Sequence, residues 1–260
     1  MVIIVFSSRV EASNNIAKNM IDLGFMKTGE KEWQKDGLRL IDCDCDSILE
    51  VRTDFDTDCI IVLSSHKSKE ERNEITAHFP GNWTDAKFGG SDSTLNIAHA
   101  SLLKNILVSM KEQVSLAKLN YNVTMEVDHH GPTCKVPIIY AELGTHQKQW
   151  TDQKAAKVVA KAVLNAVQRQ ENYKTIFAIG GGHYPQKFNK LIFDSDQFAI
   201  GHVLPKYLFK SLDEDMFKQA IEKNVSKLEK VVLLKDEFNK AQKEFVKQLC
   251  LKFEALYEEI

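Results

Sequence analysis

The chain has 260 residues, of which 43% are hydrophobic and 27% charged, and its formal net charge is −2. This composition supports a packed core and differs from that of disordered chains, and the near-neutral charge does not by itself indicate a nucleic-acid partner. The apolar run at residues 2–6 is too short for a membrane span or a signal peptide. The five cysteines are scattered and odd in number. We therefore expect a cytoplasmic protein with reduced thiols and no membrane association.

Predicted strands and helices alternate along the chain. Apolar and β-branched runs predict strands at residues 2–6, 37–43, 59–63, 121–127, 136–143, 175–179, 197–200 and 231–234. Apolar residues at helical spacing predict helices at residues 12–23, 95–118, 152–169 and 237–257. Gly24 ends the first helix, and Ser93 or Thr94 is expected to cap the second. The alternation predicts one α/β domain over residues 1–260, with a mixed, mostly parallel sheet and helices on both faces.

Histidine and glycine follow two of the predicted strands. Residues 126–132 read Glu-Val-Asp-His-His-Gly-Pro, and residues 180–184 read Gly-Gly-Gly-His-Tyr. Glu142 lies near the end of a third strand, between these two segments. Glycine leaves the backbone open to close approach, and imidazoles and carboxylates at neighbouring strand ends are the ligands of an open zinc site. These strand ends are therefore the first candidates for a metal or catalytic centre.

Further histidines show related placements. His66 and His202 each follow a short apolar run, whereas His78 lies in a segment rich in turn residues, where we expect a loop. In an extended segment His129 and His130 point to opposite sides, so we do not expect both to bind one ion. A histidine pair alone is more often structural, and the other histidines and Glu142 raise the odds of a functional site.

The glycine triplet at residues 180–182 does not match a phosphate-binding loop. It lacks the Gly-x-Gly-x-x-Gly spacing and a Walker lysine, and we expect no helix directly after it because Pro185 and Lys187 intervene. Close approach of a ligand to the backbone is the simpler explanation. No Gly-x-Ser-x-Gly motif is present, which argues against a serine hydrolase.

Basic residues are concentrated between residues 148 and 190, a segment with eight lysines and arginines and only two acidic residues. Lys154, Lys157 and Lys161 share one face of a predicted helix. A solvated helix face is the ordinary explanation. The alternative is a stripe that contacts phosphates beside the candidate site.

Several short motifs occur in order along the chain: Glu126-x-x-His129-His130-Gly131-Pro132, residues 137–144, Trp150, Gly180-Gly181-Gly182-His183-Tyr184 and Gly201-His202. Two earlier motifs are Ser65-His66-x-Ser68 and His78-x-Pro80-Gly81-Asn82. Together they resemble the D-aminoacyl-tRNA deacylases of the archaeal and plant type over most of the chain. The resemblance implies a zinc-dependent hydrolase that removes D-amino acids wrongly esterified to tRNA. It also implies a fold similar to those of peptidyl-tRNA hydrolase and the nucleoside phosphorylases.

The resemblance also implies roles for particular residues. The expected zinc ligands are His129, His183, Glu142 and His66. The expected catalytic residues are Glu126, His130 and His202. The expected contacts to the aminoacylated end of the tRNA are His78, Asn82, Asp128 and Tyr184. The distribution of basic residues, and not the resemblance, suggests Lys154, Lys157, Lys161 and Lys187 as the expected contacts to the tRNA backbone. We expect a monomer whose zinc lowers the pKa of a bound water to about 7 and polarises the ester carbonyl.

Two other classes of function remain open at this stage. A zinc peptidase or amidase acting on small molecules would use the same ligands without a basic stripe. A non-enzymatic α/β module would hold structural zinc with no open coordination position. The types of ligand residue alone do not distinguish a deacylase, a peptidase or amidase, and a structural zinc module.

Overall fold

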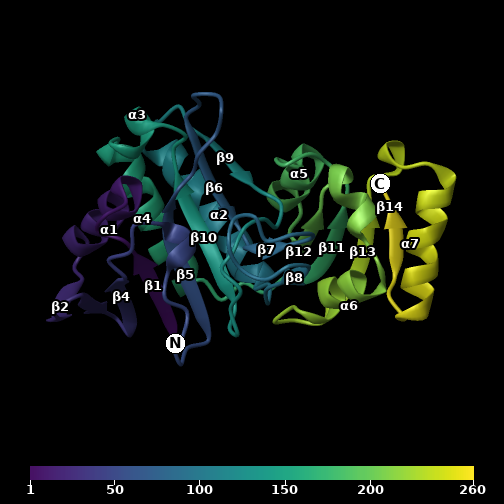
Figure 1. Cartoon of the computed structure of the whole chain (residues 1–260). Coiled ribbons are helices and arrows are strands. Elements are labelled where there is room, and N and C mark those ends of the chain that lie inside the picture. The colour runs from purple at the N-terminus through teal and green to yellow at the C-terminus, as the bar shows by residue number, and fades with distance from the viewer.

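The computed structural model describes residues 1–260 apart from the side chain of Ile48, and its two larger sheets lie side by side (Figure 1). The strands of the large sheet follow the order β2-β3-β4-β1-β5-β10-β6-β9. Their bounds are β1 (Val2–Phe6), β2 (Met26–Gly29), β3 (Glu32–Lys35), β4 (Leu38–Asp42), β5 (Cys59–Ser65), β6 (Glu74–His78), β9 (Asn122–Met125) and β10 (Ile138–Leu143).

The small sheet follows the order β12-β11-β13-β14, with bounds β11 (Lys174–Ile179), β12 (Phe198–Leu204), β13 (Leu228–Leu233) and β14 (Tyr257–Glu259). A short hairpin joins β7 (Gly81–Asn82) to β8 (Thr94–Leu95). The α-helices are α1 (Glu11–Asp22), α2 (Ala100–Leu116), α3 (Gln147–Trp150), α4 (Gln153–Gln168), α5 (Gln186–Asp194), α6 (Glu214–Glu222) and α7 (Lys240–Lys252). The 3₁₀ helices are η1 (Ile48–Glu50), η2 (Lys206–Ser211) and η3 (Lys235–Glu237).

Strand pairing confirms the predicted α/β class with a mixed, mostly parallel sheet. Strands β4, β1, β5 and β10 pair in parallel, and β6 pairs antiparallel to β10 and parallel to β9. All pairs of the small sheet are parallel. Among the described residues, no helix is both long and apolar enough to cross a membrane.

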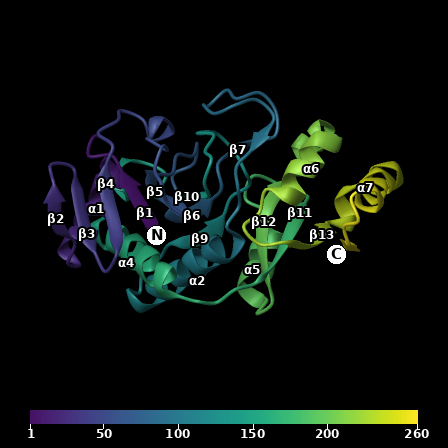
Figure 2. The ribbon, with the colours of Figure 1, turned by 90° about the horizontal axis from the view of Figure 1, so that it is seen from below.

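The two faces of the large sheet are covered differently. Alternate strand residues such as Ile4, Ile61 and Ile139 pack against α1, α2 and α4, which lie together on one side of the sheet (Figure 2). Their neighbours Ile60 and Ile138 face the other side, where loop residues cover them. Helices do cover both faces of the small sheet, with α5 and α2 on one face and α6, α7 and η2 on the other.

One hydrophobic core reaches into both sheets. It contains Ile4 and Ile61 from the large sheet together with Ile176 and Val232 from the small one. Helix α2 contacts β6 and β9 on one side and β11 and β12 on the other. This shared core supports the prediction of a single domain over residues 1–260, which remains a prediction.

Most predicted elements are confirmed within a few residues, and the exceptions have local causes. Helix α2 begins at Ala100 instead of residue 95, and the side chain of His99 accepts a hydrogen bond from the backbone of Leu102 at the helix start (3.4 Å). Helix α7 begins at Lys240 because Asn239 forms a capping box with Gln242, and the chain ends in β14 instead of a longer helix.

Two expectations close to the candidate site are wrong. His78 is the last residue of strand β6 and does not lie in a loop. Its strand was missed because the turn residues at positions 80–82 indicated a loop, although Ile75 and Ala77 alternate with polar residues as in a half-buried strand. A helix, α5, does start after the glycine triplet, with Pro185 at its N-cap. Proline suits a helix start because it lacks only an N–H that would be unpaired there.

Candidate metal and catalytic site

A row of polar side chains lies on the face of the large sheet that the helices do not cover. Glu74, Thr76 and His78 alternate along β6 with Ile75 and Ala77, which pack into the helix-covered core. Strand β10 contributes Tyr140 and Glu142 to the same face, where they lie opposite His78 and Thr76 respectively. All five polar side chains are buried. Buried polar groups need polar partners, so this face is a functional site or an internal network.

His66 joins two buried carboxylates at the centre of this row. Its Nδ1 lies 3.2 Å from Glu126 Oε1 and 3.3 Å from Glu142 Oε2, and its Nε2 lies 2.8 Å from Tyr184 Oη. Burial lowers the pKa of His66, but the hydrogen bonds to Glu126 and Glu142 outweigh it and raise the pKa to about 12. His66 is therefore an imidazolium, and both of its ring nitrogens donate.

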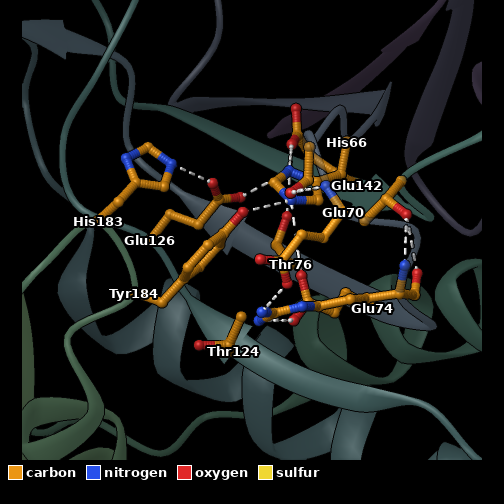
Figure 3. A network of polar contacts seen from close by, with 12 residues as sticks. His66, Glu70, Glu74, Thr76, Thr124, Glu126, Glu142, His183 and Tyr184 are labelled. Atoms are coloured by element: carbon orange, nitrogen blue, oxygen red, sulfur yellow. Dashed lines mark hydrogen bonds and ion pairs between the residues drawn. The ribbon is translucent and has the colours of Figure 1, made fainter.

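Glu126 connects His66 to His183, which follows β11 (Figure 3). Its Oε2 lies 2.8 Å from His183 Nε2 and 3.9 Å from His129 Nε2. Burial favours a raised pKa for Glu126, but the hydrogen bonds from His183 and His66 hold its pKa well below the usual value. Glu126 is thus an ionised carboxylate between three imidazoles.

His78, His129 and His130 form a second cluster beside Glu126. Each Nδ1 lies against a main-chain carbonyl: that of Phe79 for His78 (3.1 Å), Val127 for His129 (2.9 Å) and Gly131 for His130 (2.5 Å). An Nδ1–H that donates to a carbonyl leaves the Nε2 lone pair available to a metal. Among the described residues, His78 Nε2 is buried without a hydrogen-bond partner. The three rings lie 4.1 to 4.9 Å apart between centroids.

The expectation that His129 and His130 point to opposite sides is wrong. His130 has a φ of +48°, in the left-handed region, so the alternation of an extended strand does not continue through it. Burial and, to a smaller extent, the nearby His78 lower the pKa of His129 well below its usual value and that of His130 to about 4. Both rings are therefore neutral at physiological pH, the form that binds metals.

Three groups of side chains could hold a metal ion: His78 with His129 and His130, Glu126 with His129 and His183, and His66 with Glu126 and Glu142. Their ligand atoms lie within 4.8 Å of one another in each group. Nitrogen and carboxylate ligands of this kind fit zinc. Because His66 is an imidazolium held by two carboxylates, the first two groups are better suited to a cation.

A cavity of about 470 Å³ opens onto these groups. His66, Glu126, His129, His130, Glu142 and His183 form its polar wall. Val10, Leu49, Phe88 and Tyr140 contribute apolar surface, and Ser64 and Lys67 also line it. A concave, partly apolar space with convergent polar groups is typical of a small-molecule site.

The segment after β11 reaches this cavity from the small sheet. Gly180 and Gly181 have φ of +124° and +83°, which allows the chain to turn sharply after the strand. The carbonyl of His183 then accepts a hydrogen bond from Val127 N (3.2 Å), and Asn189 of α5 bonds both backbone groups of Met125 at the end of β9. The ends of β9 and β11, from different sheets, are thereby held together.

Several predicted site residues lie away from the cluster. His202 and Asp128 are buried against each other, with His202 Nδ1 2.7 Å from Asp128 Oδ1 and His202 Nε2 2.9 Å from the carbonyl of Lys223. Asp128 Oδ2 also accepts from Val203 N (2.7 Å). Asn82 donates to the carbonyls of Gly89 and Ser91 (2.9 and 3.2 Å). These three residues hold segments in place, and the structure does not bring them into the cavity.

The predicted tRNA-contacting lysines occupy two regions. Lys154, Lys157 and Lys161 are exposed on α4, which covers the face of the large sheet opposite the cavity. Lys187 is exposed on α5, close to the candidate site, and its Nζ lies 3.6 Å from Asp236 Oδ2. Contact with tRNA remains a prediction for all four.

Glu74 and Thr76 were not identified from the sequence. Thr76 donates to Glu142 Oε2 (3.4 Å), and Glu74 Oε2 lies 3.8 Å from His66 Nε2. A signal was present, because Glu74, Thr76 and His78 have the spacing of two that puts strand residues on one face. The prediction of a loop at His78 concealed it.

We expect Gly131→Ala to destabilise the cavity wall. A Cβ at residue 131 would overlap the backbone of Gly89 and Gly90, next to Phe88, which lines the cavity. Overpacking of this kind typically costs about 1–3 kcal/mol, or roughly 2–4 °C in Tm for each kcal/mol at this chain size. Thermal unfolding measures the change. Gly182→Ala is the matched control, because nothing lies within 4 Å of its added Cβ. Equal melting temperatures for the two variants would contradict the close approach at Gly131.

Comparison with known proteins finds consistent similarities. A family model described as D-aminoacyl-tRNA deacylase matches residues 53–255. Proteins named D-aminoacyl-tRNA deacylase from Pyrococcus abyssi and Pyrococcus furiosus are 30% and 28% identical, each over 96% of this chain and 98% of its own length. The protein of that name from Methanosarcina barkeri is 42% identical over 64% of this chain, and the match spans about half (54%) of the Methanosarcina protein.

A solved structure has the same fold over the whole chain. The crystal structure of AF0625, a conserved protein of unknown function, superposes with a TM-score of 0.90 at 25% identity, and the match covers 100% of this chain and 95% of AF0625.

Proposed function

The chain belongs to the family of D-aminoacyl-tRNA deacylases, and from that premise we propose that it hydrolyses the ester bond of D-aminoacyl-tRNA with the help of bound zinc. The products are the free D-amino acid and tRNA. The observation that carries this proposal is the pair of neutral imidazoles of His129 and His130, whose Nδ1 atoms lie against backbone carbonyls, placed beside ionised Glu126 at the cavity wall. These groups provide imidazole and carboxylate ligands for a metal ion.

His129, His183 and Glu126 are the proposed ligands of the catalytic ion. The side chains of His129 and His183 are 29% and 35% exposed, so an ion held there would be open to the cavity, as a catalytic site requires. His78 is fully buried and would contribute, with His130 and the shared His129, to a more enclosed set. When bound, zinc supplies a hydroxide at neutral pH and polarises an ester carbonyl.

The chain's own residues support the chemistry in two ways. The imidazolium of His66 keeps Glu142 ionised. Burial alone would raise the pKa of Glu142, but its hydrogen bond with His66 lowers it. His66 Nε2 donates to Tyr184 Oη, which leaves the phenolic hydrogen free to donate to a substrate oxygen. Burial raises the pKa of Tyr184, so the phenol remains protonated. Tyr184 is thus a proposed proton donor to the ester or to the departing ribose oxygen.

The 470 Å³ cavity suits the amino-acid side chain of the substrate. Its apolar residues Val10, Leu49 and Phe88 lie across from the polar wall that would hold the ester. The partner in this proposal is tRNA charged with D-amino acids, used by a monomeric enzyme in the cytoplasm, where charged tRNA serves translation.

The proposal is tested by stereochemistry. We expect kcat/KM for D-Tyr-tRNA to be at least about 100-fold higher than for L-Tyr-tRNA, because cleavage of L-aminoacyl-tRNA would remove the substrates of translation. Release of labelled amino acid from matched D- and L-charged tRNA measures the ratio, before and after treatment with a chelator. Equal rates for the two enantiomers would sink the assignment. Cleavage of a D-tyrosyl amide or a D-dipeptide in preference to the tRNA ester would instead identify a zinc peptidase or amidase.

A further inference from the structure

A second cavity of about 650 Å³ adjoins the candidate site. His183 lines both cavities, and Tyr184, which contacts His66 in the first cavity, lines the second. The remaining wall includes Arg72, Glu74, Lys111, Tyr121 and Phe193. A substrate whose reacting bond lies at His183 therefore has space on both sides of that bond.

Glu74 is the unusual group in this second cavity. The residue is only 5% exposed, and its Oε2 has no hydrogen-bond partner among the described residues. Its nearest cationic neighbours are His66 Nε2, 3.8 Å from Oε2, and Arg72 Nη1, 3.8 Å from Oε1. Buried carboxylate oxygens normally accept hydrogen bonds, because burial without a donor costs free energy. The free Oε2 therefore calls for a donor from outside the chain.

Aromatic and basic groups occupy the rest of the cavity. Tyr121, Tyr184 and Phe193 offer ring surfaces, and Lys111 Nζ lies 4.3 Å from the centroid of the Phe193 ring. Arg72 and Lys111 contribute positive charge. Lys111 and Phe193 also line an adjoining hollow of about 530 Å³ along α2. Rings that can stack on a base, together with cations that can meet phosphates, are what proteins use to bind single-stranded nucleic acid.

We propose that the second cavity binds the 3′-terminal nucleoside of the tRNA, with the carboxylate of Glu74 accepting a hydrogen bond from the free ribose hydroxyl beside the ester. This assignment rests on the proposed function, in which the ester lies at His129 and His183. The ribose is the part of the substrate directly attached to the ester oxygen, and Glu74 is separated from that site only by His66 and Tyr184. A carboxylate that accepts from a ribose hydroxyl is a common means of recognising nucleosides. The amino-acid side chain then occupies the first cavity.

The proposal is tested with adenosine 5′-monophosphate as a probe, which measures binding without hydrolysis. Affinities from NMR titration are compared for the wild type, Glu74→Gln and the matched control Glu71→Gln. Glu71 is exposed in the segment before β6, where it lies 3.8 Å from Lys148. A hydrogen bond to a charged group is lost in the first variant, so we expect AMP to bind roughly tenfold more weakly or worse. Glu71→Gln should bind like the wild type.

A second probe keeps the test independent of how the variant folds. The 2′,3′-dideoxy form of AMP lacks both ribose hydroxyls, so the wild type should bind it as weakly as Glu74→Gln binds AMP, and the variant should bind both probes alike. Equal affinity of the wild type for the two probes would overturn the role of Glu74. If AMP shifts protein resonances but leaves those of Tyr121, Tyr184 and Phe193 unchanged, the placement of the nucleoside in the second cavity is wrong.

Failure of the subsite is distinguishable from failure of the proposed function. If D-aminoacyl-tRNA is hydrolysed while AMP and its dideoxy form bind equally well, only the subsite assignment is lost. If AMP binding depends on Glu74 but no D-aminoacyl-tRNA is hydrolysed, the cavity binds a nucleotide and the proposed reaction is wrong.

Discussion

His129→Ala is expected to remove both bound zinc and hydrolysis of D-aminoacyl-tRNA. His129 belongs to two of the three groups that could hold an ion, and these are the two better suited to a cation, so its loss leaves neither of them complete. Changes in residues that merely orient a ligand cost about 10–100-fold in metal affinity or activity, and loss of a shared ligand should exceed that range. Elemental analysis of the purified variant gives the zinc content, and kcat/KM with D-Tyr-tRNA gives the activity.

His146→Ala provides the matched control for this change. His146 is also half-buried, but it lies at the start of α3, where its Nδ1 is 3.1 Å from Thr145 Oγ1. It belongs to none of the candidate metal groups. The control should keep its zinc and its activity. Full zinc content in a folded His129→Ala protein would eliminate this centre as the metal site.

His66→Ala is expected to destabilise the metal-free protein more than any surface change. The variant leaves Glu126 and Glu142 buried without their shared cation. Removing one partner of a buried ion pair typically costs about 3–5 kcal/mol. Urea unfolding of chelator-treated wild type and variant measures the difference. A difference below about 1 kcal/mol, the range of exposed ion pairs, would show that the carboxylates are not charged in the folded protein.

The same pair of proteins should show a defined pH dependence. The pKa of His66 is raised to about 12 in the folded protein, from about 6.5 in an unfolded chain. The stability it contributes is therefore complete below about pH 6.5 and declines as pH rises toward the folded value. The pKa values of Glu126 and Glu142 are lowered, so their contribution is lost as pH falls below about 4.3. The difference between wild type and variant should be largest near pH 5–6.5 and smaller at pH 9.

Much of the site could be anticipated because its side chains follow or end predicted strands. Glu126 and His129 follow β9, His183 follows β11, and Glu142 lies near the end of β10. The sequence did not show that β9 runs antiparallel to β10 or that β11 belongs to the other sheet. Strand positions 74, 76 and 78 were missed because the turn residues at positions 80–82 indicated a loop and concealed the short alternation of polar and apolar residues before them.

Other features depended on contacts that sequence patterns do not contain. The left-handed backbone at His130, which turns both histidines toward His78, is not predictable from an extended run. His202 follows a glycine, as His183 does, yet it packs against Asp128 between the sheets. Spacing alone does not show whether a histidine near a strand meets a cavity or another segment. The basic residues of α4 likewise required the sheet topology, which places them opposite the cavity.

Because Glu126 and His183 come from different sheets, the site can assemble only after strands of both sheets have been synthesised. Glu126 follows β9 of the large sheet and His183 follows β11 of the small one, and the tie between Asn189 and Met125 holds them together. A nascent chain emerges from the ribosome N-terminus first and folds as its segments become available. The large sheet can be complete once β10 has emerged, but the centre cannot assemble until α5 has followed it. An activity that depends on this centre can therefore arise only after α5 has emerged from the ribosome.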